Sequence, residues 1–187
     1  MLNSCIDKIM RSYTLFLLIA VLFSSCDSFW LKDKHTRAVL KSEKGFIRGV
    51  EFDMTKEQVK KIEKDTLVEE SERFLGYVNE LNKGKDHLQV EYFFNEKNQL
   101  DQIMINYYLN EEDDVQDLIA DLTEYFNKKI GPGKKDEAGW NIWNYEDKKG
   151  APGNVDILLF RKLDNTYGRI VDLEIVKYYN WEESESQ

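Results

Sequence analysis

Cysteine, proline and histidine are scarce in this chain of 187 residues, and the scarcity of cysteine excludes whole classes of protein. There are two residues of each type, and no cysteine follows Cys26. The chain beyond Cys26 therefore has no disulfide framework, no cysteine nucleophile and no thiolate metal site. Its stability must come from a hydrophobic core, for which 42% hydrophobic and 13% aromatic residues are sufficient.

Positive charge is also in short supply. The chain has 26 Lys and Arg against 35 Asp and Glu, a formal net charge of -9, and no basic stripe interrupts the acidic background. Nucleic-acid binding depends on clustered Lys and Arg that displace phosphate counterions. We therefore predict no nucleic-acid partner. The same negative charge disfavours adsorption of the folded surface to anionic lipid headgroups.

A short apolar run near the N-terminus is the segment whose role the sequence identifies best. Residues 13–23 are apolar except for Thr14, follow the basic Lys8 and Arg11, and lead into Ser24-Ser25-Cys26. The run is too short to cross about 30 Å of hydrocarbon, and this order of features is typical of a bacterial lipoprotein signal. We predict that residues 1–25 are removed and that acyl chains on Cys26 anchor the protein to a membrane of the cell envelope.

Two alternatives to lipidation remain open at this stage, an uncleaved membrane anchor and an ordinary signal peptide cut after Ser25. Phe23 stands where such signals usually carry Leu, and Met10 offers a second translation start that would omit Cys5. Lipoprotein processing would leave 162 residues with a formal charge of -10. We predict three parts for this mature chain: a lipidated tether (26–45), a single globular domain (46–181) and a disordered acidic tail (182–187).

Hydrophobic periodicity predicts two helices and six strands in the globular part. A capping box at Thr55 and Gln58 opens the first helix, and acidic residues followed by a 3.6-residue apolar repeat mark the second. The predicted helices are 55–64 and 111–129, and the predicted strands are 73–81, 88–94, 100–109, 140–145, 155–163 and 169–179. We therefore predict an α+β fold in the order α-β-β-β-α-β-β-β, with two helices packed on antiparallel sheet(s) and a suggested internal duplication of an αβββ unit.

One part of this pattern resembles a known family. The segment GVEFDMTKEQVKKIE at 49–63, the segment YFFNEKNQL at 92–100 and Ile103 are similar to the helix and hairpin of small BamE/SmpA-like lipoproteins, which are β-lactamase-inhibitor-like modules. The resemblance implies a non-enzymatic binding or scaffold role at the cell envelope. It also implies an envelope protein as partner.

Residues that carry chemistry elsewhere do not form a recognisable set here. The acidic residues 111–114 lack the spacing of a calcium loop and suit a helix N-terminus. His35 and His87 are far apart in sequence and are predicted to be surface histidines, and Gly131-Pro132-Gly133 is predicted to end a helix. We therefore predict no catalytic residues, no cofactor and no metal ligands.

Aromatic residues in the second half are the remaining candidates for a binding site. Three tryptophans, Trp140, Trp143 and Trp181, are candidate ligand contacts, and they favour an alternative function as a glycan- or peptide-binding lipoprotein. Trp140 and Trp143 fall on opposite faces of an ideal strand, so at least one of them should lie in the core or at a bulge. Trp181 precedes the acidic tail and is predicted to be exposed.

Overall fold

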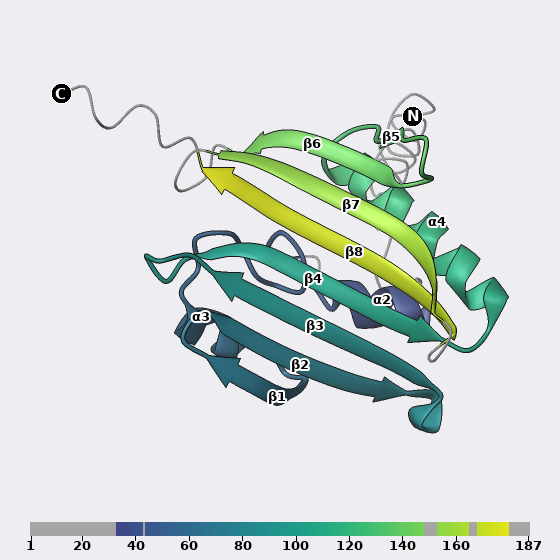
Figure 1. The fold of residues 1–187 in the computed structure, drawn as a ribbon, viewed down its shortest axis with the longest axis horizontal. Coiled ribbons are helices and arrows are strands. Elements are labelled where there is room, and N and C mark those ends of the chain that lie inside the picture. Colours follow the sequence, from purple (N-terminus) through teal and green to yellow (C-terminus); the bar gives the residue numbers. More distant parts are fainter. Residues whose placement is uncertain (1–32, 43, 148–152, 165–167, 180–187) are drawn as a thin grey trace, which may run out of the picture. The chain divides into compact units, whose positions relative to one another are not determined.

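The computed structural model describes residues 33–42, 44–147, 153–164 and 168–179, within a compact unit that begins at Asp33 (Figure 1). Predictions about residues 1–25, Cys26, Trp181 and the tail fall outside these ranges. The helices are α2 (Lys34–Leu40), α3 (Lys56–Ile62), the 3-10 helix η2 (Asn82–Gly84) and α4 (Glu112–Lys129). The strands are β1 (Thr66–Ser71), β2 (Phe74–Leu81), β3 (Asp86–Phe94), β4 (Leu100–Leu109), β5 (Lys134–Lys135), β6 (Asn141–Asp147), β7 (Gly153–Asp164) and β8 (Gly168–Tyr179).

All eight strands belong to one antiparallel sheet in the order β1-β2-β3-β4-β8-β7-β6-β5. The predicted fold is therefore wrong in its element order, its number of strands and its αβββ unit. Each half of the sheet is a run of four consecutive strands, and the two runs meet where β4 pairs with β8. Sequence patterning missed β1 because all six of its residues are exposed, and β5 because it has two residues.

Two helices and one hairpin form where the sequence predicts them. Thr55 accepts a hydrogen bond from the backbone N–H of Gln58, and the Gln58 side chain accepts one from the backbone N–H of Thr55, which completes the capping box of α3. Strands β3 and β4 pair as a hairpin through their predicted residues. Acidic side chains occupy the first turn of α4 and basic ones the last, as the helix dipole favours.

Helices α2 and α4 lie on one face of the sheet, behind the strands in Figure 1. Four side chains of α4 are buried, namely Val115, Leu118, Leu122 and Phe126. Side chains on β3 and β4 alternate between buried and half-buried, so the buried set faces the helices. Within the described ranges, no helix combines the length and the apolar character that crossing a membrane requires.

The second half of the predicted tether is part of the folded unit. Residues 34–40 form α2, and four of its seven side chains are buried: His35, Thr36, Val39 and Leu40. The prediction of a tether that extends to residue 45 is therefore wrong for these residues. Seven residues do not provide enough periodicity to be recognised as an amphipathic helix.

A buried arginine joins α2 to α3. Arg48 is 2% exposed. Its guanidinium donates to the backbone carbonyls of Ala38 and Val39, to Glu63 Oε2 at 2.9 Å and to Asp65 Oδ2 at 2.5 Å. Glu63 also accepts from the hydroxyl of Tyr92 on β3, at 2.8 Å. This network ties both helices to the sheet, because its partners come from α2, from the residues just after α3 and from β3.

Candidate functional site

The second face of the sheet carries no helix within the described part of the chain, and this uncovered face is turned toward the viewer in Figure 1. On β3, β4, β8 and β7 its side chains are mostly the half-buried members of an alternating pattern. Cross-strand register places Glu91 beside Met104 and Met104 beside Glu174, in one row across β3, β4 and β8. The face therefore combines polar and apolar groups from strands that are distant in sequence.

Among the carboxylates of the uncovered face are four on β3, β7 and β8, and three of these four accept hydrogen bonds from neutral amides. Glu91 accepts from the Gln89 side chain at 2.7 Å, and Glu174 accepts from Gln102 at 2.8 Å. Asp156 accepts from Asn144 at 2.6 Å. The fourth carboxylate is Asp172. Across the described ranges, no ion pair joins any of the four to a Lys or Arg, so their negative charge is not neutralised by contact.

Asp172 has the least complete hydrogen bonding of the four carboxylates. Its Oδ1 atom is buried without a hydrogen-bond partner among the described residues. Burial raises the pKa of Asp172, and the nearby charge of Glu174 raises it further, while Lys162 acts in the opposite direction. An unsatisfied buried acceptor costs stability, so this position is not optimised for the isolated fold.

Pairs of aromatic rings lie on either side of the carboxylates. Phe74 on β2 and Phe93 on β3 have ring centroids 5.1 Å apart. On the other half of the sheet, Trp140 stacks on Phe160 with centroids 4.4 Å apart and planes 14° from parallel. Trp140 is therefore half-buried at the uncovered face, although one side of its ring is already occupied by Phe160.

Trp143 lies in the core and is 2% exposed. Its ring contacts Phe126 of α4, and its Nε1 donates to Asn127 Oδ1 at 2.9 Å. A Cβ atom at Gly133 would lie 2.5 Å from the indole, so Gly133 serves this close approach as well as the turn after α4. The prediction that Trp143 is a surface ligand contact is therefore wrong. Its side chain points to the face of the sheet that α4 covers.

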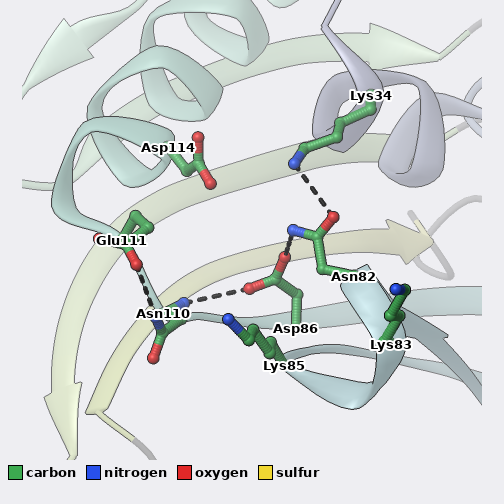
Figure 2. Close-up of a pocket in the computed structure, with 8 residues that line it drawn as sticks. All are labelled: Lys34, Asn82, Lys83, Lys85, Asp86, Asn110, Glu111 and Asp114. Carbon is green, nitrogen blue, oxygen red and sulfur yellow. Dashed lines mark hydrogen bonds between the residues drawn. The ribbon is translucent and has the colours of Figure 1, made fainter.

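A polar cavity of about 400 Å3 opens beside the N-termini of α2, β3 and α4 (Figure 2). It is lined by Lys34, Asn82, Lys83, Lys85, Asp86, Asn110, Glu111 and Asp114. Asp86 is held by two N–H donors, the Asn82 side chain and the backbone of Asn110. Lys34 donates to Asn82 Oδ1 at 3.1 Å and is thereby held across the cavity from Asp86.

His35 contacts Asp114, which lines this cavity, and is fully buried, so its prediction as a surface histidine is wrong. Its Nδ1 is 2.6 Å from the hydroxyl of Tyr107, and its Nε2 is 3.0 Å from Asp114 Oδ2. Burial and the nearby charge of Asp86 raise the pKa of Tyr107, which stays a neutral hydroxyl. His87 is half-buried on the uncovered face beside the ring of Tyr108.

The sequence contained one usable signal for the uncovered face and none for the cavity. Glu91 and Glu174 alternate with buried apolar residues in β3 and β8, which marks them as members of a non-core face. The pairing of β4 with β8 brings them together, and sequence alone does not give that pairing. His35, Asp86 and Asp114 come from three elements, one of which was not predicted.

The chain matches no family model, no curated protein and no solved structure.

Proposed function

We propose that this protein is a lipid-anchored, non-enzymatic binding protein of the bacterial cell envelope, and that the uncovered face of its sheet binds a positively charged surface of a partner protein. The observation that carries the proposal is the set of carboxylates formed by Glu91, Asp156, Asp172 and Glu174. No cation of the described chain pairs with them. A basic partner would supply the missing positive charge.

Charge complementarity favours this occupant over other classes. Negative groups on a surface repel nucleic acid and anionic lipid headgroups, and they attract Lys and Arg side chains. The apolar groups between the carboxylates, such as Met104 and Leu158, add area that a protein partner can bury. The resemblance to BamE/SmpA-like modules supports the same class of role.

The proposed lipid anchor also limits how far the domain extends from the membrane. Cys26 precedes Asp33, where the folded unit begins, by seven residues. Seven fully extended residues span at most about 25 Å. A lipidated Cys26 would thus hold the start of α2 within about 25 Å of the bilayer surface, so the expected partner is a protein at the membrane.

Binding of basic peptides tests the proposed face. We expect a fluorescent lysine-rich decapeptide to bind the full-length protein in a salt-sensitive manner, and a glutamate-rich decapeptide not to bind. The triple variant E91Q/D172N/E174Q should weaken binding by about tenfold, since each exposed ion pair contributes roughly 0.5 kcal/mol. Fluorescence anisotropy at two salt concentrations measures both effects.

A matched control separates the face from the overall charge. The variant D113N/D117N/E137Q removes the same number of negative charges at exposed positions on α4 and the following loop. It should bind the basic peptide as the wild type does. Equal weakening by both triple variants would contradict the proposal. Tryptophan fluorescence that responds to oligosaccharides, with no binding of basic peptide, would favour glycan binding near Trp140 instead.

Lipidation of Cys26 is tested in cells. We expect palmitate label in the wild-type protein, loss of that label in Cys26→Ala, and accumulation of a heavier precursor when globomycin blocks the lipoprotein signal peptidase. Cys5→Ala is the matched control and should label normally. A wild-type protein without label, or a Cys26→Ala protein that still carries it, would contradict lipidation at this residue.

A further inference from the structure

Two carboxylates that line the cavity of Figure 2 lie close to a buried histidine, and all three side chains carry donor atoms of types that metals bind. They are His35 from α2, Asp86 from the start of β3 and Asp114 from the first turn of α4. One donor atom from each lies within 4.8 Å of the other two. The site is distinct from the uncovered face and does not depend on the function proposed for that face.

Burial distinguishes this group from an ordinary cluster of acidic residues. His35 is 0% exposed and Asp86 is 1% exposed. The carboxylate of Asp86 is held by two neutral N–H donors and, among the described residues, forms no ion pair. Buried charges in proteins are usually paired or coordinate metals, so a buried Asp86 without a paired cation points to a cationic ligand.

The histidine is oriented as metal-binding histidines are. Its Nδ1 meets the buried hydroxyl of Tyr107 at 2.6 Å, and this contact fixes the ring so that Nε2 points to Asp114. A hydroxyl both donates and accepts, so Tyr107 suits either tautomer of the imidazole. Metal-bound histidines almost always donate their second ring N–H to an acceptor, most often a carboxylate, a backbone carbonyl or water, and the Tyr107 oxygen can accept in the same way.

We propose that His35 Nε2 and the carboxylates of Asp86 and Asp114 bind one divalent transition-metal ion of the zinc type. Metal–ligand bonds of about 2.1 Å place ligand atoms about 3.4 Å apart in a tetrahedral site. Separations of up to 4.8 Å would therefore contract by up to about 1.4 Å when the ion binds, and the 3.0 Å between His35 Nε2 and Asp114 Oδ2 would widen slightly. One nitrogen and two oxygen donors favour Zn2+ over Ca2+, which prefers oxygen ligands alone. Solvent completes the coordination.

A metal ion can bind here only if the lysine side chains around the cavity stay out of the cluster. Lys34 and Lys85 line it and would repel a metal ion if they entered the cluster. Lys34 is instead bonded to Asn82 Oδ1, at 3.1 Å.

Calorimetric titration with ZnCl2 tests the site. The sample is the tag-free full chain with Cys5→Ser and Cys26→Ser, because free thiols also bind zinc. We expect one Zn2+ per chain, a rise in melting temperature with Zn2+, and at least a tenfold loss of affinity in Asp114→Asn. Asp113→Asn, which removes the same charge from the same helical turn at an exposed position, should bind as the parent does.

Three outcomes would overturn the proposal: no Zn2+ binding by the parent chain, equal affinities in the two Asn variants, or tighter binding of Ca2+ than of Zn2+. The NMR signals of the His35 ring report directly whether this side chain binds the ion, which a change in stability alone would not show. They should shift with Zn2+ in the parent and in Asp113→Asn, and a parent spectrum in which they stay fixed would exclude His35 as a ligand.

Discussion

Replacement of Arg48 by methionine is expected to lower the free energy of unfolding by about 3–5 kcal/mol, because it removes one partner of a buried ion network. Methionine keeps much of the side chain's volume but none of its donors. The carbonyls of Ala38 and Val39 and the carboxylate of Asp65 lose hydrogen bonds as a result. Urea unfolding followed by tryptophan fluorescence measures the change.

Lys61→Met is the matched control for Arg48→Met, because it removes one positive charge from an exposed position on α3. Its free energy of unfolding should stay within about 0.5 kcal/mol of the wild type. An Arg48→Met protein as stable as the control would show that the network does not hold α2 and α3 in place.

The effect of Arg48→Met should also depend on pH. Burial alone would raise the pKa of Glu63, but the charge of Arg48 and hydrogen bonds from Arg48 and Lys41 lower it well below its ordinary value. A carboxyl whose pKa is lowered by folding stabilises the protein above its unfolded pKa, about 4.3, and loses this effect as pH falls. The difference between wild type and variant should therefore be largest above about pH 5 and shrink below about pH 4.

Replacement of Phe126 by alanine is expected to cost about 3–5 kcal/mol of stability, the usual range for a buried phenylalanine. Phe126 is 0% exposed. Its ring lies 5.3 Å from that of Trp143 and 6.5 Å from that of Phe46, so it joins α4 to β6 and to the segment after α2. Urea unfolding measures the loss.

Asp117→Ala, an exposed change on the same helix, is the control for Phe126→Ala and should be nearly neutral. The cavity left by Phe126→Ala should also alter the fluorescence of the folded state, because Trp143 loses its neighbour. A loss below about 1 kcal/mol with unchanged fluorescence would contradict the packing of α4 against the sheet.

The elements that were predicted correctly are those whose signals lie within one segment of the sequence. The capping box at Thr55 and the apolar repeat of α4 are properties of one segment, and both helices form where those signals lie. The hairpin of β3 and β4 is also local. By contrast, α2 is short, and its burial comes from contacts with Tyr107 and Asp114, which lie more than 70 residues away.

The strand order and the composition of the uncovered face depend on long-range strand pairing, which the sequence patterns did not predict. The predicted αβββ unit failed because exposed strand β1 carries no burial pattern and because β4 pairs with β8 across the middle of the chain. That pairing creates the row containing Glu91 and Glu174. Trp143 on β6 packs against Phe126 of α4 in the core, where its indole is unavailable to a surface ligand.

The central claim is that the uncovered, acidic face of the sheet is the binding surface. Chemical-shift mapping of the lysine-rich peptide on 15N-labelled protein tests it most directly. We predict that the amides that shift belong to β3, β4, β8 and β7 around Glu91, Asp172 and Glu174, and that α4 stays unchanged. Shifts confined to α2, α4 or the polar cavity, or no shifts at a saturating peptide concentration, would contradict the account.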